Sequence, residues 1–345
     1  MADKIEEFKE QYPSLDSYWR SIILFGQNTA SYKFALGKAL FDIVNTGTTH
    51  VSLEDLAIPY SKHICEHLKN APRQATNPTS TFLKACKDFN EDKITETELI
   101  DTTVDKGFNY VLDAFHTVNK KPITVEFFKK DFSNGHKEIY LTTEIFKLVE
   151  LPQAKNLEAE IESRWNLVET AWNMNVSKNI LNVKYDNESE LLFIDDKLKR
   201  KDVTSARGAL NGYQKGKCFY CFDNIIVNDD GTNTCDVDHF FPHSLQPFFP
   251  DINLDGVWNL VLSCYRCNRG ENGKFALVPA MKYLERLHRR NEYLIYSHHP
   301  LRETIIKQTG ATEEERRKFL LSVDQRAIDI LIHRWEIEEV ASATF

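Results

Sequence analysis

The sequence predicts a mainly α-helical protein with a small α+β core in its second half. Apolar residues recur at three- and four-residue steps through most of residues 1–155, which is the spacing of one buried helix face. The same spacing returns in three stretches of the second half. Strand-like alternation is clearest within residues 180–194, so helices should dominate and the sheets should be small.

Length and composition predict two domains. The chain has 345 residues, of which 42% are hydrophobic, enough to build a substantial core. Since a domain takes about 150 residues, two domains are expected. We place a helical domain at residues 1–155, with a regulatory, partner-binding or oligomerising role, and a second domain at residues 156–345.

The first domain is expected to be helical almost throughout. Two early apolar stripes define its core helices: Tyr18, Trp19, Ile22, Ile23 and Phe25, and then Phe34, Leu36, Leu40, Phe41 and Val44. Ser52 followed by two acidic residues resembles a helix start, but Pro59 predicts that this helix is short or interrupted. Residues 95–118 are a further acidic helical candidate.

The second domain should begin with a helix whose apolar residues form a one-sided stripe, made by Leu157, Ile161, Trp165, Val168 and Trp172. Such a stripe predicts packing rather than a cofactor site. Residues 180–194 then suit a hairpin that turns at residues 186–189. Helical stretches at 280–293 and 313–339 close the chain, the second with apolar Ile328, Leu331, Ile332 and Trp335.

Charge is divided unevenly along the chain. The formal net charge is −8, which taken alone argues against a nucleic-acid partner. Residues 1–196 hold 22 Lys+Arg against 31 Asp+Glu, whereas residues 197–345 hold 21 against 20. Residues 197–217 carry a net +6 and residues 264–290 a net +5. Basic stretches are usually solvated faces, but two of them in one region suit a phosphate backbone.

The sequence also bears on the compartment. No run of about 18 apolar residues occurs, and the charged start is unlike a signal peptide, so we expect a cytoplasmic protein with no membrane partner. Four of the seven cysteines form two Cys-x-x-Cys pairs, which in a reducing compartment favours metal over disulfides. Cys65, Cys86 and Cys235 are expected to be small buried residues.

The two Cys-x-x-Cys pairs predict a structural zinc site. Cys218 and Cys221 form the first pair, Cys264 and Cys267 the second, and 42 residues separate the pairs. Four thiolates on two turns are the ligand set of a closed tetrahedral zinc site, which leaves no position open for a substrate. The alternative is that all four are ordinary buried thiols, and the paired spacing makes this the weaker interpretation.

Three polar segments lie between and after the cysteine pairs. They are Asp238-His239-Phe240-Phe241-Pro242, then Asn259-Leu260, and then Cys264 to Lys274 in the pattern Cys-x-x-Cys-Asn-x-x-x-x-x-Lys. In this order they resemble the HNH endonucleases of the zinc-stapled, McrA-like type. The resemblance covers about residues 205–280. It implies a ββα-metal core, two strands and a helix around one cation, within a nuclease domain that includes the flanking helices and hairpin.

The resemblance implies catalytic roles for four residues. His239 would be the general base, which suits a side chain whose ordinary pKa lies near neutrality. Asp238 and Asn268 would hold a catalytic cation, and two oxygen ligands without an imidazole favour Mg²⁺ or Mn²⁺. Asn259 would brace the loop between strand and helix and so orient the histidine. The remaining candidates, each of which could equally be a solvated side chain, are Asn272 as a third ligand and Arg266, Arg269, Lys274 and His243 as phosphate contacts.

The function that the resemblance implies is metal-dependent hydrolysis of phosphodiester bonds, with DNA as the expected substrate. Added domains of this kind suggest a role in restriction or anti-phage defence. Two alternatives stay open: a catalytically silent, zinc-stabilised nucleic-acid-binding or scaffold subunit, and an RNA-cutting, toxin-like nuclease. The helical domain would bind a protein partner, form a homodimer or control the site.

Overall fold

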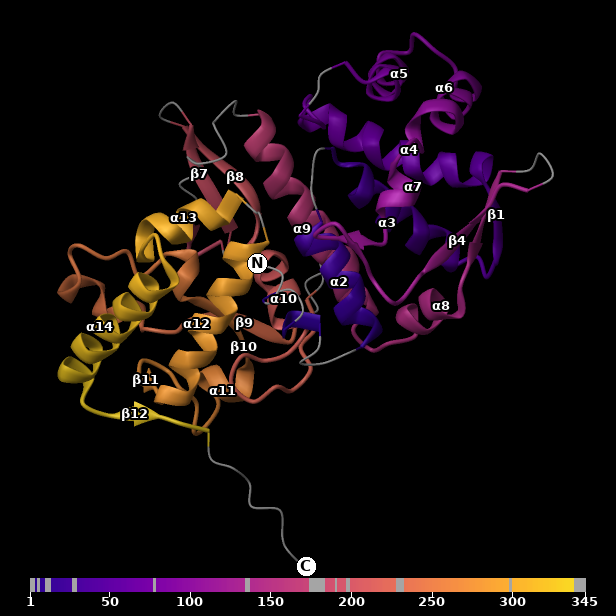
Figure 1. Ribbon diagram of the computed structural model, residues 1–345. Coiled ribbons are helices and arrows are strands. Elements are labelled where there is room, and N and C mark those ends of the chain that lie inside the picture. Colours follow the sequence, from indigo (N-terminus) through magenta and orange to yellow (C-terminus); the bar gives the residue numbers. More distant parts are fainter. Residues whose placement is uncertain are drawn as a thin grey trace, which may run out of the picture. The chain divides into compact units, whose positions relative to one another are not determined.

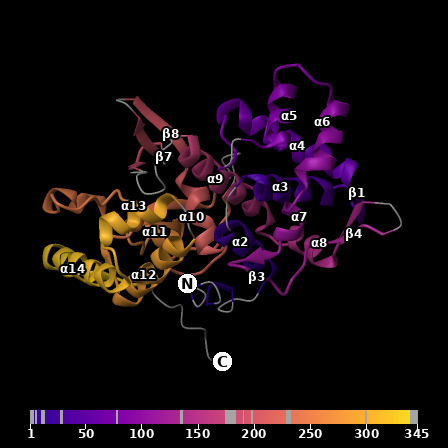
Figure 2. The same ribbon diagram turned by 45° about the horizontal axis from the view of Figure 1, so that its top comes forward.

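The computed structural model describes residues 4, 7–9, 14–26, 30–76, 79–133, 137–173, 184–189, 191–196, 199–227, 233–297 and 300–337. It divides into two compact units, Met1–Ser177 (unit 1) and Lys178–Phe345 (unit 2). Both units consist mostly of helices with small sheets (Figure 1, Figure 2), so the predicted mainly α class is confirmed.

The division between the units lies later than the predicted boundary after residue 155. Helix α9 (Ala154–Asn173) was assigned to the second domain, but it packs against α2 (Leu15–Phe25) and α3 (Tyr32–Val44). The physical reason is its apolar stripe, because Ile161 and Trp165 are fully buried among the helices of unit 1. The prediction that this stripe serves packing is therefore confirmed, and the helix belongs to unit 1.

Unit 1 combines these three helices with further helices and two small sheets. Its other described helices are α4 (Leu53–Asn70), α5 (Thr81–Asn90), α6 (Glu96–Thr102), α7 (Val111–Ala114) and α8 (Thr143–Val149). A three-stranded antiparallel sheet has the order β1 (His50–Ser52), β5 (Glu138–Leu141), β4 (Phe128–Asp131). A small hairpin is made by β2 (Thr117–Val118) and β3 (Lys121–Pro122).

The core of unit 1 forms where the two predicted early stripes meet. Trp19 is 1% exposed and packs its indole against Phe41, with 4.7 Å between ring centroids, and against Phe127 at 5.1 Å. Beside this cluster Arg20 donates through Nε and Nη2 to Glu160 of α9, each at 2.8 Å. Because both charged groups are buried, this paired contact fixes α2 against α9.

Helix α4 begins as predicted and then continues past Pro59. The Ser52 hydroxyl accepts a hydrogen bond from the Asp55 amide at 3.0 Å, which caps the first turn. The prediction of a short or interrupted helix is wrong, since the helix reaches Asn70. A proline removes one backbone hydrogen bond, but Tyr60 and Ile64 beyond it are fully buried, and their burial outweighs that loss.

The predicted helix over residues 95–118 is much shorter in the structure. Thr95 and Glu98 form a capping box at the start of α6, which ends at Thr102. A π-helical turn, Thr103–Gly107, follows, and Tyr110 has a left-handed backbone with φ of 70°. This reversal separates the π-helical turn from the short helix α7, and the segment finishes in β2.

Unit 2 opens with a three-stranded antiparallel sheet, β6 (Lys184–Asp186), β7 (Leu191–Asp196) and β8 (Lys199–Ser205). The hairpin turning at residues 186–189 is confirmed, although its predicted start at residues 180–183 lies outside the described residues. The helices are α10 (Ala206–Gln214), α11 (Tyr265–Arg269), α12 (Met281–Tyr296), α13 (Pro300–Thr309) and α14 (Glu313–Leu331). The short central elements are β9 (Cys235–His239), a 3-10 turn at His243–Phe248, another at Val257–Asn259, and β10 (Leu260–Cys264).

The last predicted helix ends before Trp335. Helix α14 stops at Leu331, because Ile332 takes a left-handed backbone with φ of 64°. Trp335 instead lies in β12 (Arg334–Trp335), which pairs in parallel with β11 (Val278–Pro279). The helical expectation was wrong at Trp335, which lies beyond the helix end and is buried with its ring against those of Tyr220 and Tyr283.

Cys65, Cys86 and Cys235 are buried, as predicted. In the part of the chain that the structure describes, the helices are either too short or too polar to cross a membrane.

Candidate metal centre and active site

Strands β9 and β10 form the centre of unit 2. They pair antiparallel, with His239 opposite Leu260 and Cys235 opposite Cys264, and most of their side chains are buried. Helix α11 follows β10 directly and packs on both strands. Two strands and a short helix therefore lie together in this part of unit 2.

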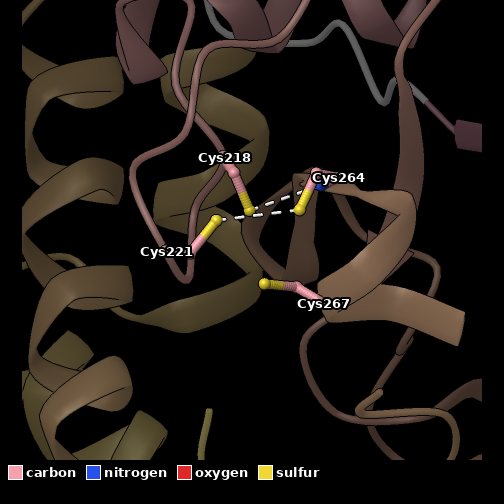
Figure 3. Close-up of side chains that lie close together, drawn as sticks. All are labelled: Cys218, Cys221, Cys264 and Cys267. Carbon is pink, nitrogen blue, oxygen red and sulfur yellow. Dashed lines mark hydrogen bonds between the residues drawn. The ribbon is translucent and has the colours of Figure 1, made fainter. Parts of the chain in front are cut away.

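The four cysteines of the two pairs converge beside this hairpin. Their sulfur atoms all lie within 4.8 Å of one another, and those of Cys221 and Cys264 are 3.7 Å apart. Figure 3 shows the two pairs approaching from opposite sides, with the sulfur atoms directed toward one another. Cys218 and Cys267 are almost completely buried, so the space between the sulfurs is closed to solvent on their side.

Local backbone geometry explains how each pair presents its sulfurs. After Cys221 the chain reverses at Phe222, whose φ is 63°, and the Phe222 amide donates to the Cys218 carbonyl at 3.1 Å. The amide of Asp223 lies 3.5 Å from the Cys221 sulfur. On the other side, Cys264 ends β10 and directly precedes α11, and its amide donates to the Cys218 sulfur at 3.3 Å. Amide donors of this kind stabilise negative charge on sulfur.

The four thiols strongly affect one another's proton affinity. Hydrogen bonds from neighbouring thiols lower the pKa of Cys221 to about 5 and also lower the pKa of Cys264. Hydrogen bonds with the same neighbours raise the pKa of Cys218 and Cys267. Four thiolates could share so small a space only around a cation. The four sulfur donors, the burial of Cys218 and Cys267 and the short distances between the sulfur atoms fit a tetrahedral metal ion such as zinc.

Asp238, the predicted ligand of a catalytic cation, is committed to two other groups. Its Oδ1 lies 2.9 Å from the Lys274 ammonium, and its Oδ2 accepts a hydrogen bond of 2.7 Å from the Tyr220 hydroxyl. Lys274 is fully buried, so it is not the exposed phosphate contact that was predicted. Burial and the Asp238 charge raise the pKa of Tyr220, which keeps the phenol protonated as a donor.

Asn268, the second predicted ligand, contacts Asp236 instead of Asp238. Its amide nitrogen donates to Asp236 Oδ2 at 3.1 Å, and Arg269 donates to Asp236 Oδ1 at 2.7 Å. Alternate residues of a strand share a face, so Asp236 and Asp238 both lie on the side of β9 that α11 covers. The fit to Mg²⁺ or Mn²⁺ is poor in this arrangement, because Lys274 already neutralises Asp238 and no contact joins Asp238 to Asn268 among the described residues.

His239 points to a different set of partners. Its Nε2 lies 2.9 Å from Asp255 Oδ1, and His243 Nδ1 lies 2.7 Å from the same oxygen. The ring of Tyr185 approaches His239 edge-on, with 5.7 Å between centroids. The hydrogen bond from His239, followed by that from His243, lowers the pKa of Asp255 from its ordinary value. An ionised carboxylate only accepts hydrogen bonds, so both imidazoles donate to it.

Asn259 is fully buried and ties together the two loops around His239. Its Oδ1 accepts from the Phe241 amide at 2.9 Å, and its Nδ2 donates to the carbonyls of Phe241 at 2.9 Å and Leu254 at 2.8 Å. Phe241 follows His239 by two residues and Leu254 precedes Asp255. The amide therefore holds the histidine and the carboxylate that contacts it.

The basic residues of the stretch 264–290 are mostly engaged within unit 2. Four of the seven face a carboxylate, in the pairs Arg266–Asp223, Arg269–Asp236, Lys274–Asp238 and Lys282–Glu336. Arg286 donates to backbone carbonyls, including that of Tyr220, and stacks on the Phe222 ring at 4.0 Å. Arg290 is buried. The net charge of this stretch is thus not a measure of free basic surface.

Tyr220 and Asp255 are the two contacts that sequence reasoning missed. Tyr220 lies between the first two cysteines, and its burial gives no signal in the sequence. Asp255 stands four residues before Asn259, where an acidic residue looks like any loop residue. Comparison of the chain with protein-family models, with curated proteins and with solved structures finds no match.

Proposed function

We propose that unit 2 is a nuclease that hydrolyses phosphodiester bonds, with DNA as its substrate and His239 as its general base. The observation that carries the proposal is the fixed setting of His239: the imidazole donates to Asp255, and Asn259 holds the loops of both residues. Support also comes from the presence, in the same unit, of a cysteine cluster that can hold zinc.

The hydrogen bond to Asp255 selects the tautomer of His239. Because Nε2 carries the proton that Asp255 accepts, Nδ1 of the neutral ring keeps its lone pair. That nitrogen would take the proton of the attacking water. The carboxylate would then stabilise the imidazolium that forms, and the same hydrogen bond would keep the ring in place.

The resemblance further implies Mg²⁺ or Mn²⁺, which would neutralise charge on the phosphate and the leaving oxygen. Since Asp238 and Asn268 do not form a ready site for it, we derive no step through that ion. His243 is half exposed, and once its Nδ1 donates to Asp255 its Nε2 is left to face the phosphate. It remains our candidate for that contact.

The test is cleavage of supercoiled plasmid by the full chain in Mg²⁺ or Mn²⁺, with EDTA as the reference. Wild type should nick the plasmid, and His239→Ala should lower the rate by at least about 100-fold, the usual contribution of a general base. The zinc held by the four-cysteine cluster and the unfolding temperature should stay unchanged in this variant. His333→Ala, an exposed histidine of the same unit, is the matched control. Undiminished nicking by His239→Ala would contradict the assignment.

One observation favours the catalytically silent nucleic-acid-binding or scaffold subunit as the second candidate. Both oxygens of Asp238 are engaged, which is what a site that has lost its cation would look like. Binding of plasmid or structured RNA without cleavage in any metal would support this candidate. Cleavage of RNA in place of DNA would support a toxin-like nuclease instead.

For the biological role, the two-unit architecture is the only support. We propose restriction or anti-phage defence, with unit 1 binding a protein partner or a second copy of the chain. Expression of wild type should reduce phage plating, whereas His239→Ala should not. Equal phage plating on cells that express wild type and His239→Ala would contradict the defence role, but it would not bear on the proposed cleavage chemistry.

A further inference from the structure

We propose that His239, His243 and Asp255 form a transition-metal site, separate from the four-cysteine cluster. The three side chains offer one ligand atom each, and these atoms lie within 4.8 Å of one another. Metal binding here follows from the geometry alone. Its effect on cleavage rests on the proposed nuclease function.

The spacing of the three atoms suits a small ion. Asp255 Oδ1 is 2.9 Å from His239 Nε2 and 2.7 Å from His243 Nδ1. A tetrahedral ion with bonds of about 2.0–2.1 Å holds neighbouring ligand atoms about 3.3 Å apart. Side-chain movements of less than about 1 Å would therefore admit the ion in place of the two hydrogen bonds.

The backbone that carries the three residues is held in place. His239 ends β9, His243 begins the 3-10 turn at His243–Phe248, and the Asp255 amide donates to Asn253 Oδ1 at 3.0 Å. The buried Asn259 amide joins the strand end to the loop before Asp255. Such a site is assembled before the metal arrives, so binding requires little ordering of the chain.

The donor chemistry selects the metal. Two imidazoles and one carboxylate favour Zn²⁺, Co²⁺ or Ni²⁺, whereas Mg²⁺ prefers a shell of oxygens. The His239 side chain is 8% exposed, but those of His243 and Asp255 are 50% and 29% exposed. The ion would thus have three protein ligands and an open side for water.

Occupancy of this site would inhibit cleavage. A neutral imidazole has one lone pair, and coordination through Nε2 moves the proton to Nδ1. His239 could then no longer accept a proton from water. Zinc beyond the one equivalent that the cysteine cluster binds would therefore inhibit the proposed nuclease.

The binding test uses the untagged full chain with one equivalent of zinc, followed by titration with Co²⁺. We expect a second equivalent to bind with weak visible d–d absorption and without the intense near-ultraviolet band of cobalt thiolate. His243→Ala and Asp255→Asn should weaken this binding by at least about tenfold, the lower range for disturbed metal sites. His333→Ala should bind Co²⁺ like wild type. The inference is overturned if wild type takes up no second ion, if the thiolate band accompanies uptake, or if neither variant weakens it.

A second measurement tests inhibition on the same proteins. The ratio of nicking rates without and with excess Zn²⁺ should be large for wild type and close to one for Asp255→Asn. Equal ratios, or faster nicking by wild type in excess zinc, would overturn the inhibitory role. If wild type never nicks in any metal, the proposed function fails, while the cobalt titration still decides whether the site exists.

Discussion

Single side chains decide the setting of the proposed base, and Asn259 is the clearest of them. A sequence pattern could assign it a bracing role by resemblance, but the three atoms it contacts became known only with the loops in place. Lys274 illustrates the opposite case. Its basic character predicted an exposed phosphate contact, yet the ammonium is buried against Asp238, because burial depends on packing that the residue type does not report.

We expect Asn259→Ala to destabilise unit 2 by about 2–4 kcal/mol. The change removes three hydrogen bonds and leaves buried backbone groups of Phe241 and Leu254 without partners, at a net cost of about 1 kcal/mol each or somewhat more. Urea denaturation followed by tryptophan fluorescence measures the effect. The exposed Asn272→Ala is the control and should unfold within about 0.5 kcal/mol of wild type. Equal midpoints for the two variants would contradict the bracing role.

At the scale of elements, the cysteine cluster joins two segments that lie far apart in the sequence and also contact each other through the Phe219 amide and the Leu262 carbonyl. The loop after α10 supplies Cys218 and Cys221, whereas the junction of β10 and α11 supplies Cys264 and Cys267. The regular spacing of these residues made the cluster predictable. Asp255 was not predictable, because its approach to His239 depends on how the chain between β9 and β10 folds back.

Removal of one cluster cysteine should cost both the metal and the stability of unit 2. Cys264→Ala should lower the zinc bound by the cluster from one equivalent to well below one, and the lost stability should be on the order of 10 kcal/mol, as for small zinc domains. Metal analysis and thermal unfolding measure the two effects. Cys235→Ala removes a buried cysteine of the same unit outside the cluster and should keep its zinc. Equal zinc content in the two variants would contradict a four-cysteine site.

The contact between α4 and α9 predicts a pH dependence in unit 1. His67 stacks on Trp165 with centroids 3.5 Å apart, and its Nδ1 lies 2.8 Å from Glu169 and its Nε2 3.3 Å from Glu162. Burial lowers the pKa of His67, but hydrogen bonds and charges of the two glutamates outweigh it and raise the pKa to about 8. In turn His67, together with Lys38, lowers the pKa of Glu162 to about 2 despite its burial.

A folded pKa of about 8 against an unfolded value of about 6.5 stabilises unit 1 most below about pH 6.5. This stabilisation, about 2 kcal/mol, should be lost as the pH rises through 8. Unfolding free energies of wild type should therefore fall between about pH 6 and pH 9.5 by more than those of His67→Gln. Parallel pH curves for the two proteins would show that the histidine is not charged in the folded state.

At the scale of the molecule, the pattern of apolar residues predicted the helical class and both closing helices, but not where the units divide. That division depends on which surface α9 covers, a property of the assembled unit. The position of this division also changes the net charge assigned to each half of the chain. Residues 1–177 hold 20 Lys+Arg against 26 Asp+Glu, and residues 178–345 hold 23 against 25, so unit 2 is slightly acidic as a whole.

The ion pairs of residues 264–290 therefore bear on how nucleic acid would be held. A free cation that neutralises a phosphate releases a condensed counterion. Five such contacts would give a slope of about −4.5 in a plot of the logarithm of the binding constant against the logarithm of the salt concentration. A guanidinium or ammonium that already faces a protein carboxylate first has to leave it, and that carboxylate must then recruit its own cation from solution. The gain in counterion entropy is thereby reduced. The affinity of residues 264–290 for a DNA duplex would then depend on shape and on the exchange of carboxylate for phosphate partners more than on ionic strength.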